Sequence, residues 1–253
     1  MRAKLQNYFS CSIEQTSKNH PYYEYPFAMK FILCLIFFSS MTGFYGQPYP
    51  EGTIEEPPAN EWKLKKETNN IKIYYRKSTD SQVNEVKINT TVESTLSGLI
   101  SVLRDVPNYS NWIYKCELAQ PLGKSSNAEG LYYTELDFPW PLQNRDMIAH
   151  SQISQDKDTK VITIKVQGKP AYIKTKKDKV RIEVLELTWV LTPLPGGKIN
   201  IDYQLLSDPG GNLPAWLINM AIDQGPTQTI MGLQKQVKNK KYQAMRLSYV
   251  EEL

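Results

Sequence analysis

The chain has 253 residues, 41% of them hydrophobic, which is ordinary for a folded protein and enough for one large domain or two small ones. Its formal net charge of +4 falls to +2 beyond residue 46, where 26 basic and 24 acidic side chains remain. Bulk charge therefore gives no indication of nucleic-acid binding. Only Cys116 lies beyond residue 46, and no Cys/His spacing resembles a metal site, so we expect no internal disulfide, metal ion or other cofactor there.

The leading region contains a short apolar run at 31–38, directly after Met29 and Lys30. A charged start, an apolar run and small residues behind it are typical of a secretory signal peptide, and the run is well short of the ~20 residues that span a membrane. We expect a signal peptide at 29–46, export to the periplasm or the cell exterior, and translation from Met29, which leaves 1–28 as an untranslated upstream extension. A membrane anchor and a buried segment of a cytosolic protein are the alternatives.

A proline-rich linker is predicted at residues 47–60, which contain four prolines. We expect the folded domain to occupy residues 61–253. Its first part shows short alternating runs of apolar and polar residues, separated by turn-forming residues, which predict an opening meander of three strands. The expected strands are 62–66, 71–77 and 83–91.

A helix is predicted after these strands. Ser94 or Thr95 is expected to cap it, apolar residues follow at helical spacing, and Pro107 should end it near Asp105. A short turn at 108–112 then leads back to the sheet.

Six further strands are predicted in the second half of the chain, at 114–122, 130–138, 145–154, 161–166, 180–193 and 198–207. Within the fifth of these, the apolar phase shifts by one residue between Val184 and Leu185. One face cannot bury both sets, so we expect a β-bulge near Val184.

A tight reversal is predicted at Asp208–Trp216, where Pro209 presets a turn and two glycines tolerate positive φ. One long amphipathic helix should follow, kinked at Gly225-Pro226 so that 216–222 moves as part of a lid. Strands and helices in this order, without βαβ alternation, predict an α+β fold with an antiparallel sheet.

Several motifs stand in a recognisable order. They are Trp62; Asp105 with Tyr109 and Trp112; Phe138–Pro141 followed by Asn144–Asp146; Val180-Arg181; and Asp208–Gly211 with Pro214–Trp216. This order, over about residues 61–247, resembles the START family of lipid-transfer domains. The resemblance implies a helix-grip fold, in which a curved antiparallel sheet of about nine strands wraps the long C-terminal helix and leaves an internal tunnel. It also implies non-catalytic binding, and transfer, of a lipid or other apolar small molecule, and we expect a monomer.

Strand parity gives candidates for the tunnel wall, because alternate residues of a strand share a face. We expect Tyr133 and Glu135 to face inward, where a buried Glu135 would be neutral or hydrogen-bonded and orient a ligand hydroxyl. A solvent-facing Glu135 is the alternative. The expected lipid-binding set is Trp112, Tyr133, Glu135, Met147, Ala149, Ser151, Trp189, Tyr203, Trp216 and Met220.

A gate at the tunnel mouth is expected in the loop 138–144, formed by Phe138, Trp140 and Leu142. Trp140 either dips into a membrane interface during opening or packs between its own prolines. Arg145 and Asp146 are interpreted as a structural pair that pins the end of this loop.

Two lysine clusters, at 174–179 and 235–241, either dock an anionic bilayer transiently or form solvated surface. Two other functions stay open: an enzyme that uses Glu135 as a general base, and an interaction domain whose cavity is filled by side chains. A hydrolase triad would need a histidine, and His150, the only one beyond residue 46, is expected to face away from the tunnel by parity.

Overall fold

The computed structural model describes residues 61–78, 83–211, 213, 217–218 and 224–253, all within one compact unit, Glu55–Leu253. The predicted extension, signal peptide and linker lie outside the described residues, and so do Trp216 and Met220. The expectations that rest on them therefore remain predictions. No helix in the described ranges has the length and apolar character needed to cross a membrane.

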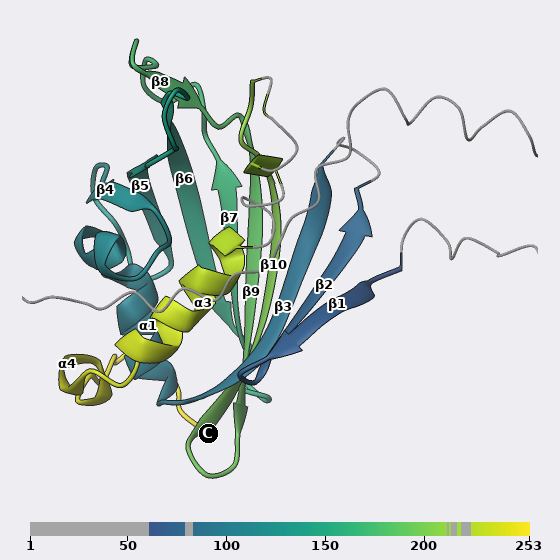
Figure 1. Ribbon diagram of the computed structural model, residues 1–253. Helices are drawn as coiled ribbons and strands as arrows, with labels where there is room; N and C mark the ends of the chain where they lie inside the picture. Colours follow the sequence, from purple (N-terminus) through teal and green to yellow (C-terminus); the bar gives the residue numbers. More distant parts are fainter. Residues whose placement is uncertain (1–60, 79–82, 212, 214–216, 219–223) are drawn as a thin grey trace, which may run out of the picture. The chain divides into compact units, whose positions relative to one another are not determined.

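Nine strands follow one another in a single antiparallel sheet, in the order β1-β2-β3-β10-β9-β7-β6-β5-β4 (Figure 1). Their bounds are Lys63–Thr68 for β1, Ile71–Lys77 for β2, Asn84–Glu93 for β3, Cys116–Pro121 for β4, Glu129–Leu136 for β5, Asn144–Gln155 for β6, Ile162–Gly168 for β7, Val184–Leu194 for β9 and Lys198–Asp208 for β10. The predicted meander forms β1 to β3, and the order then jumps from β3 to β10 because β10 pairs with both β3 and β9.

The predicted β-bulge at Val184 is wrong, because the chain interrupts the strand there. β8, Lys179–Arg181, leaves the nine-strand path and pairs in parallel with the start of β6, and β9 begins only at Val184. Both Ile182 and Leu185 are buried. The break at 182–183 therefore achieves what a bulge would have achieved, which is to bury apolar residues of both phases.

The helix predicted after β3 is confirmed as α1, Leu96–Arg104. The hydroxyl of its N-cap residue Thr95 accepts a hydrogen bond from the Gly98 amide. The carboxylate of Glu252, near the C-terminus, accepts hydrogen bonds from the amides of Leu96 and Ser97, so the tail of the chain supplements the cap. A short 3-10 helix, η2 (Val106–Asn111), forms the predicted turn that leads to β4.

The expected single C-terminal helix is two helices where the structure describes it. α3 spans Gly225–Gln236 and α4 spans Lys240–Gln243. Asn239 between them is extended and caps α4 with its side chain, so the lysines of 235–241 do not share one helical face. Pro226 lies in the first turn of α3, where its missing N–H needs no partner.

α3 crosses the inner face of the curved sheet (Figure 1). Its residues Ile230 and Leu233 are completely buried. Gly232 faces the segment after η2 so closely that a Cβ there would overlap the carbonyl oxygen of Trp112. A glycine at this position therefore allows α3 to lie close to the segment after η2.

Candidate functional site

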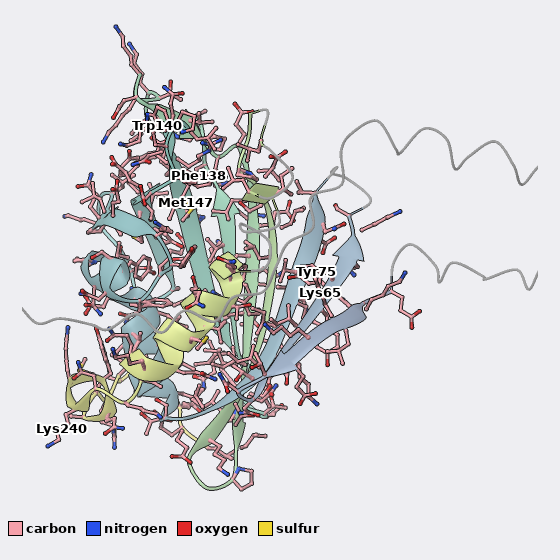
Figure 2. All side chains as sticks on the ribbon, in the orientation of Figure 1. Lys65, Tyr75, Phe138, Trp140, Met147 and Lys240 are labelled. Atoms are coloured by element: carbon pink, nitrogen blue, oxygen red, sulfur yellow. The ribbon has the colours of Figure 1, made fainter. Side chains whose placement is uncertain are left out.

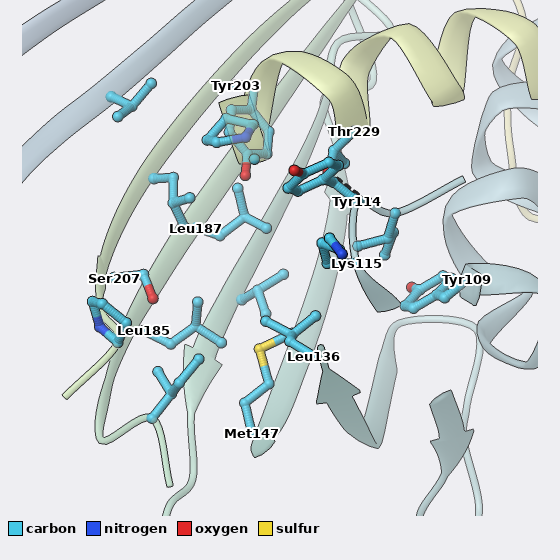
Figure 3. Close-up of a pocket in the computed structure, with 18 of the residues that line it drawn as sticks. Tyr109, Tyr114, Lys115, Leu136, Met147, Leu185, Leu187, Tyr203, Ser207 and Thr229 are labelled. Atoms are coloured by element: carbon cyan, nitrogen blue, oxygen red, sulfur yellow. Dashed lines mark hydrogen bonds between the residues drawn. The ribbon is translucent and has the colours of Figure 1, made fainter. Parts of the chain in front are cut away.

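A cavity of about 280 Å³ lies between the inner face of the sheet, the region of η2 and α3 (Figure 3). This volume far exceeds the ~10–15 Å³ that holds one water molecule, and it is close to the ~300–1,000 Å³ of small-molecule pockets. Side chains of the described core therefore do not fill the fold. The wall is mainly apolar, with Val86, Leu103, Tyr109, Trp112, Ile113, Tyr114, Tyr132, Leu136, Phe138, Met147, Ile153, Ile164, Val166, Ile182, Leu185, Leu187, Trp189, Tyr203, Leu205, Leu213 and Ile218.

Strand alternation determines which side chains reach the cavity. On β9, Leu185, Leu187 and Trp189 are two residues apart and all line the wall. On β10, Tyr203 is paired with Trp189 in the ladder, and their rings are 4.6 Å apart in an edge-to-face arrangement. These two strands provide a rigid apolar floor.

The few polar groups of the wall are mostly hydroxyls. The Tyr203 hydroxyl is directed into the cavity and has no hydrogen-bond partner within the described ranges (Figure 3). Burial raises the pKa of the Tyr203 phenol, so it is a neutral donor at physiological pH. By contrast, Ser151 donates to the Gly130 carbonyl at 3.2 Å, and the Thr229 hydroxyl accepts from the Tyr114 amide at 3.1 Å.

Four charged residues border the cavity, and each is paired with or hydrogen-bonded to another protein group. Lys115 pairs with Asp137 at 2.7 Å. The Arg104 guanidinium donates to the carbonyls of residues 126 and 127, and the Asp208 carboxylate accepts from the Gly210 amide. The cavity therefore offers a ligand hydroxyl groups and apolar surface rather than a free charge.

Five members of the expected lipid-binding set lie in the cavity wall: Trp112, Met147, Ser151, Trp189 and Tyr203. Ala149 is on the same face of β6 but is covered, so it does not line the wall. Whether any of these residues contacts a ligand remains a prediction.

Tyr133 and Glu135 do not line the cavity, which corrects their expected inward placement. The adjacent residues Tyr132 and Leu136 line it instead. Every residue from Tyr132 to Glu135 is buried, so both faces of this strand are covered and parity from sequence was ambiguous.

Glu135 belongs to a polar network on the opposite face of β5. Its carboxylate accepts hydrogen bonds from the Tyr133 hydroxyl at 2.8 Å and from Lys176 at 2.6 Å, and it pairs with Lys179 at 3.2 Å. Burial raises the pKa of Glu135, but these hydrogen bonds oppose burial and hold the pKa below its ordinary value. Glu135 is therefore ionised at neutral pH and turned away from the cavity, which removes it as a general base for a cavity ligand.

Arg145 and Asp146 are not paired with each other, which corrects their interpretation as one structural pair. Asp146 accepts two hydrogen bonds from Arg181, at 2.7 and 3.0 Å, and both side chains are buried. This bidentate pair holds β8 against the start of β6.

Arg145 points to the other side and joins the loop 138–144 to the turn after β10. Its guanidinium donates to the carbonyls of Pro209 at 3.2 Å, Gly210 at 3.1 Å and Gln143, and it lies 4.2 Å from the ring centre of Phe138. The Asn144–Asp146 and Asp208–Gly211 motifs are therefore in direct contact.

The three expected gate residues occupy different environments. Phe138 lines the cavity, whereas Leu142 is half-buried and does not. Trp140 is 92% exposed, so it does not pack between its own prolines. His150 lies outside the wall, with Nε2 3.6 Å from a carboxylate oxygen of Glu129, as its parity predicted. Across the described ranges, no group of acidic, histidine and cysteine side chains could hold a metal ion.

Sequence reasoning missed much of the wall, including Tyr132, Leu136, Ile164, Val166, Leu185, Leu187, Leu205 and Ser207. The alternation of β9 and β10 carried a usable signal, because Trp189 and Tyr203 were already candidates and their neighbours two residues away share their face. No such signal existed for Ile182, which reaches the wall because of the break between β8 and β9.

The fold and the cavity define a class of protein: an α+β domain in which a curved antiparallel sheet and a C-terminal helix enclose an apolar binding site. A model of the START domain matches residues 57–243. The chain therefore belongs to the START domain family, and the predicted helix-grip fold is confirmed.

Known proteins and solved structures that are similar to this chain are consistent with its membership of this family. An uncharacterized protein of Pseudomonas aeruginosa is 29% identical over 175 residues, which are 69% of this chain and 86% of that protein. The rat phosphatidylcholine transfer protein is 25% identical over 187 residues, 71% of this chain and 85% of its own length. The crystal structure of a STAR-related lipid transfer protein of Xanthomonas axonopodis has a TM-score of 0.65 and 28% identity, covering 70% of this chain and 99% of that one. The structure of human StAR-related lipid transfer protein 5 has a TM-score of 0.63 and 18% identity, and the match covers 73% of this chain and 88% of that one.

Proposed function

We propose that this domain binds one lipid in the cavity and carries it between membranes, without catalysing a reaction. The observation that carries the proposal is the unfilled apolar cavity, which is bordered by hydroxyl groups and by charged residues that already have partners. Membership of the START family and the lipid-transfer names of several relatives support it.

We further propose that the ligand is a neutral lipid with a hydrogen-bond acceptor, such as an ester or hydroxyl oxygen. The Tyr203 hydroxyl is a buried donor that faces the cavity, and a matching acceptor would satisfy it. A buried phosphate would need a free cation, but Lys115 is paired with Asp137, and the Arg104 guanidinium already donates to two backbone carbonyls. Residues 79–82 and 212–223, most of which lie outside the described ranges, contain no lysine or arginine.

We propose that the ligand enters near Phe138, with the loop 138–144 as the gate and the C-terminal helix as a second moving part. Phe138 lines the cavity. The Arg145 guanidinium lies over the Phe138 ring and donates a hydrogen bond to the Pro209 carbonyl in the turn. The Arg145 contacts would have to change if the loop and the turn separate.

We also propose that the protein is exported through the signal peptide at 29–46 and acts as a monomer.

Native mass spectrometry of the purified full chain, followed by lipid extraction, tests the function. We expect an additional mass that is released on denaturation and identified as a neutral lipid. Leu187→Trp, which fills the cavity from β9, should reduce the bound fraction at least tenfold, whereas Glu186→Trp on the exposed face should not. A phospholipid in the extract would contradict only the neutral-lipid proposal. No bound mass, together with no uptake of fluorescent lipids from vesicles, would contradict lipid binding itself.

A further inference from the structure

The loop between β7 and β8, residues 169–178, is strongly basic. Residues 169–179 contain five lysines and one aspartate, a net charge of +4. Residues 61–253 as a whole contain 26 basic and 21 acidic side chains, a net charge of +5. This loop and the first residue of β8 are therefore one of two strongly basic segments; the other, 235–246, contains five basic and no acidic side chains.

The lysines of this loop have two different environments. Lys176 and Lys179 both pair with the buried carboxylate of Glu135, and this fixes the loop to the sheet. Lys169, Lys174 and Lys177 are exposed and form no ion pair with any residue in the described ranges. The loop is thus anchored by two lysines and presents three others to solvent.

Large apolar side chains are exposed beside these lysines. Tyr172 is 59% exposed, Ile173 is 36% exposed and Trp140, in the gate loop, is 92% exposed. The Gln143 side chain donates to the Lys177 carbonyl at 3.4 Å, which connects the gate loop to the basic loop. Trp140 in Figure 2 lies at the end of the domain where Figure 1 shows β8, and Lys240 lies at the opposite end.

Backbone contacts hold the apolar residues in this exposed position. The Arg181 guanidinium, fixed by Asp146, donates to the carbonyls of Pro170 and Ile173. Aromatic and aliphatic side chains that a loop holds exposed to water are unfavourable unless they become buried in a binding partner or a membrane.

We propose that the basic loop 169–178 and Trp140 together form a docking surface for an anionic lipid bilayer. Tryptophan and tyrosine side chains favour the boundary between headgroups and acyl chains. Lysines beside them attract anionic headgroups, and the combination of apolar and basic residues is typical of proteins that lie on a membrane surface. A nucleic acid would use the lysines but would give Ile173 no apolar environment.

Docking in this orientation would bring Phe138, two residues from Trp140 and part of the cavity wall, close to the bilayer. The surface would therefore explain where lipid exchange takes place. Its binding to a bilayer does not depend on the proposed cavity function, because none of Lys169, Tyr172, Ile173, Lys174 or Lys177 lines the cavity.

Vesicle flotation with the full chain tests the docking surface. Vesicles of phosphatidylcholine with phosphatidylglycerol should bind the protein, and vesicles of phosphatidylcholine alone should bind it much less. Each surface lysine contributes roughly fivefold in affinity, so K174E/K177E should weaken binding to the anionic vesicles by at least ~25-fold. The control K238E/K240E changes two exposed lysines, Lys240 at the opposite end of the domain and Lys238 two residues before it, and should change binding less than about twofold.

A second variant separates the apolar contribution. Y172S/I173S should weaken binding to the anionic vesicles at least ~10-fold, and this loss should persist in 1 M salt, where the lysine contribution is screened. Equal binding of wild type and K174E/K177E, an equal loss in K238E/K240E, or no preference for the anionic vesicles would overturn the proposal. Native mass spectrometry of K174E/K177E should still show the cavity ligand, so a failure of docking and a failure of lipid binding would be distinguished.

Discussion

The two faces of β5 and β6 differ in how they treat buried polar groups. On the inner face, Tyr132 and Met147 border a mainly apolar cavity. The outer face carries Tyr133, Glu135 and Asp146, each directly next in sequence to a residue of the cavity wall. These three side chains form a network of hydrogen bonds and ion pairs with one another and with the basic segment around β8. Adjacent residues of β5 and β6 thus differ in role: one lines the apolar cavity, and the next belongs to the polar network on the other face.

This difference shows how the sheet can surround an unfilled space. Side chains that border a cavity lose packing contacts on one side, which costs stability. On the outer face, the charged pairs tie β8 and the loop before it to the same two strands, so those strands keep their positions without support from inside. The following predictions test this division, beginning with the largest expected effect.

Asp146→Ala should destabilise the protein by about 3–5 kcal/mol, because it leaves the buried Arg181 without its carboxylate. Chemical denaturation measures the change. Asp137→Ala, which removes an exposed carboxylate paired with Lys115, is the matched control and should cost less than about 1 kcal/mol. Equal effects of the two substitutions would show that the outer network does not support the sheet.

Arg145→Lys should cost about 1.5–3 kcal/mol, because a lysine cannot reach the three carbonyls and the Phe138 ring together. We also expect faster exchange of a fluorescent lipid, measured by stopped flow, since the gate loop and the turn would be less tightly joined. Arg76→Lys, at a half-exposed pair with Glu85, should change neither quantity appreciably. Unchanged exchange in Arg145→Lys would contradict its role between the two segments.

Gly232→Ala should destabilise by about 1–3 kcal/mol, since the added Cβ overlaps the Trp112 carbonyl oxygen and must push α3 away from the segment after η2. Gly225→Ala is the control in the same helix, because the nearest atom to its Cβ is 4.0 Å away, in Tyr114. Thermal unfolding compares them. A stable Gly232→Ala variant would mean that the inner face tolerates movement of α3.

Glu135→Gln should cost about 1–2 kcal/mol at neutral pH, since it removes the charge that Lys176 and Lys179 share. The pKa of Glu135 in the folded protein lies below its ordinary value of 4.5, so its stabilisation is present above that pH and is lost as the pH falls through the folded pKa. The difference between wild type and variant should therefore shrink as the pH falls below 4.5.

Chemical denaturation across this pH range measures the change. Glu183→Gln, at an exposed position, is the control and should differ from wild type by less than about 0.5 kcal/mol throughout. A difference for Glu135→Gln that stays constant with pH would show that its ion pairs contribute nothing.

Much of the fold was predictable because its signals are local. The opening strands, the Thr95 cap of α1 and the turn with positive φ at Gly210 and Gly211 all depend on residues close in sequence. Part of the cavity wall was also predictable, since Trp189 and Tyr203 follow plain alternation on β9 and β10.

Other features depended on contacts between distant residues. β8 leaves the sheet path because Arg181 reaches Asp146, 35 residues away, and nothing near Val184 distinguishes that break from a bulge. The C-terminal helix ends at Gln236, and in α4 Tyr242 and Lys241 both contact Asp105. The helical spacing of the apolar residues gives no indication of an end at Gln236, and one long helix was therefore predicted.

The sequence by itself determined the fold class and the family, because the order of strands, helices and turn motifs is encoded in short stretches of chain. Only the tertiary structure decided which side of β5 faces the cavity. Tyr132 and Tyr133 are both buried aromatic residues, so neither the composition nor the period of the strand separates them. The choice was made by Lys176, Lys179 and Arg181, which lie beyond β7 in the chain and provide the charge that Glu135 and Asp146 need once they are removed from water.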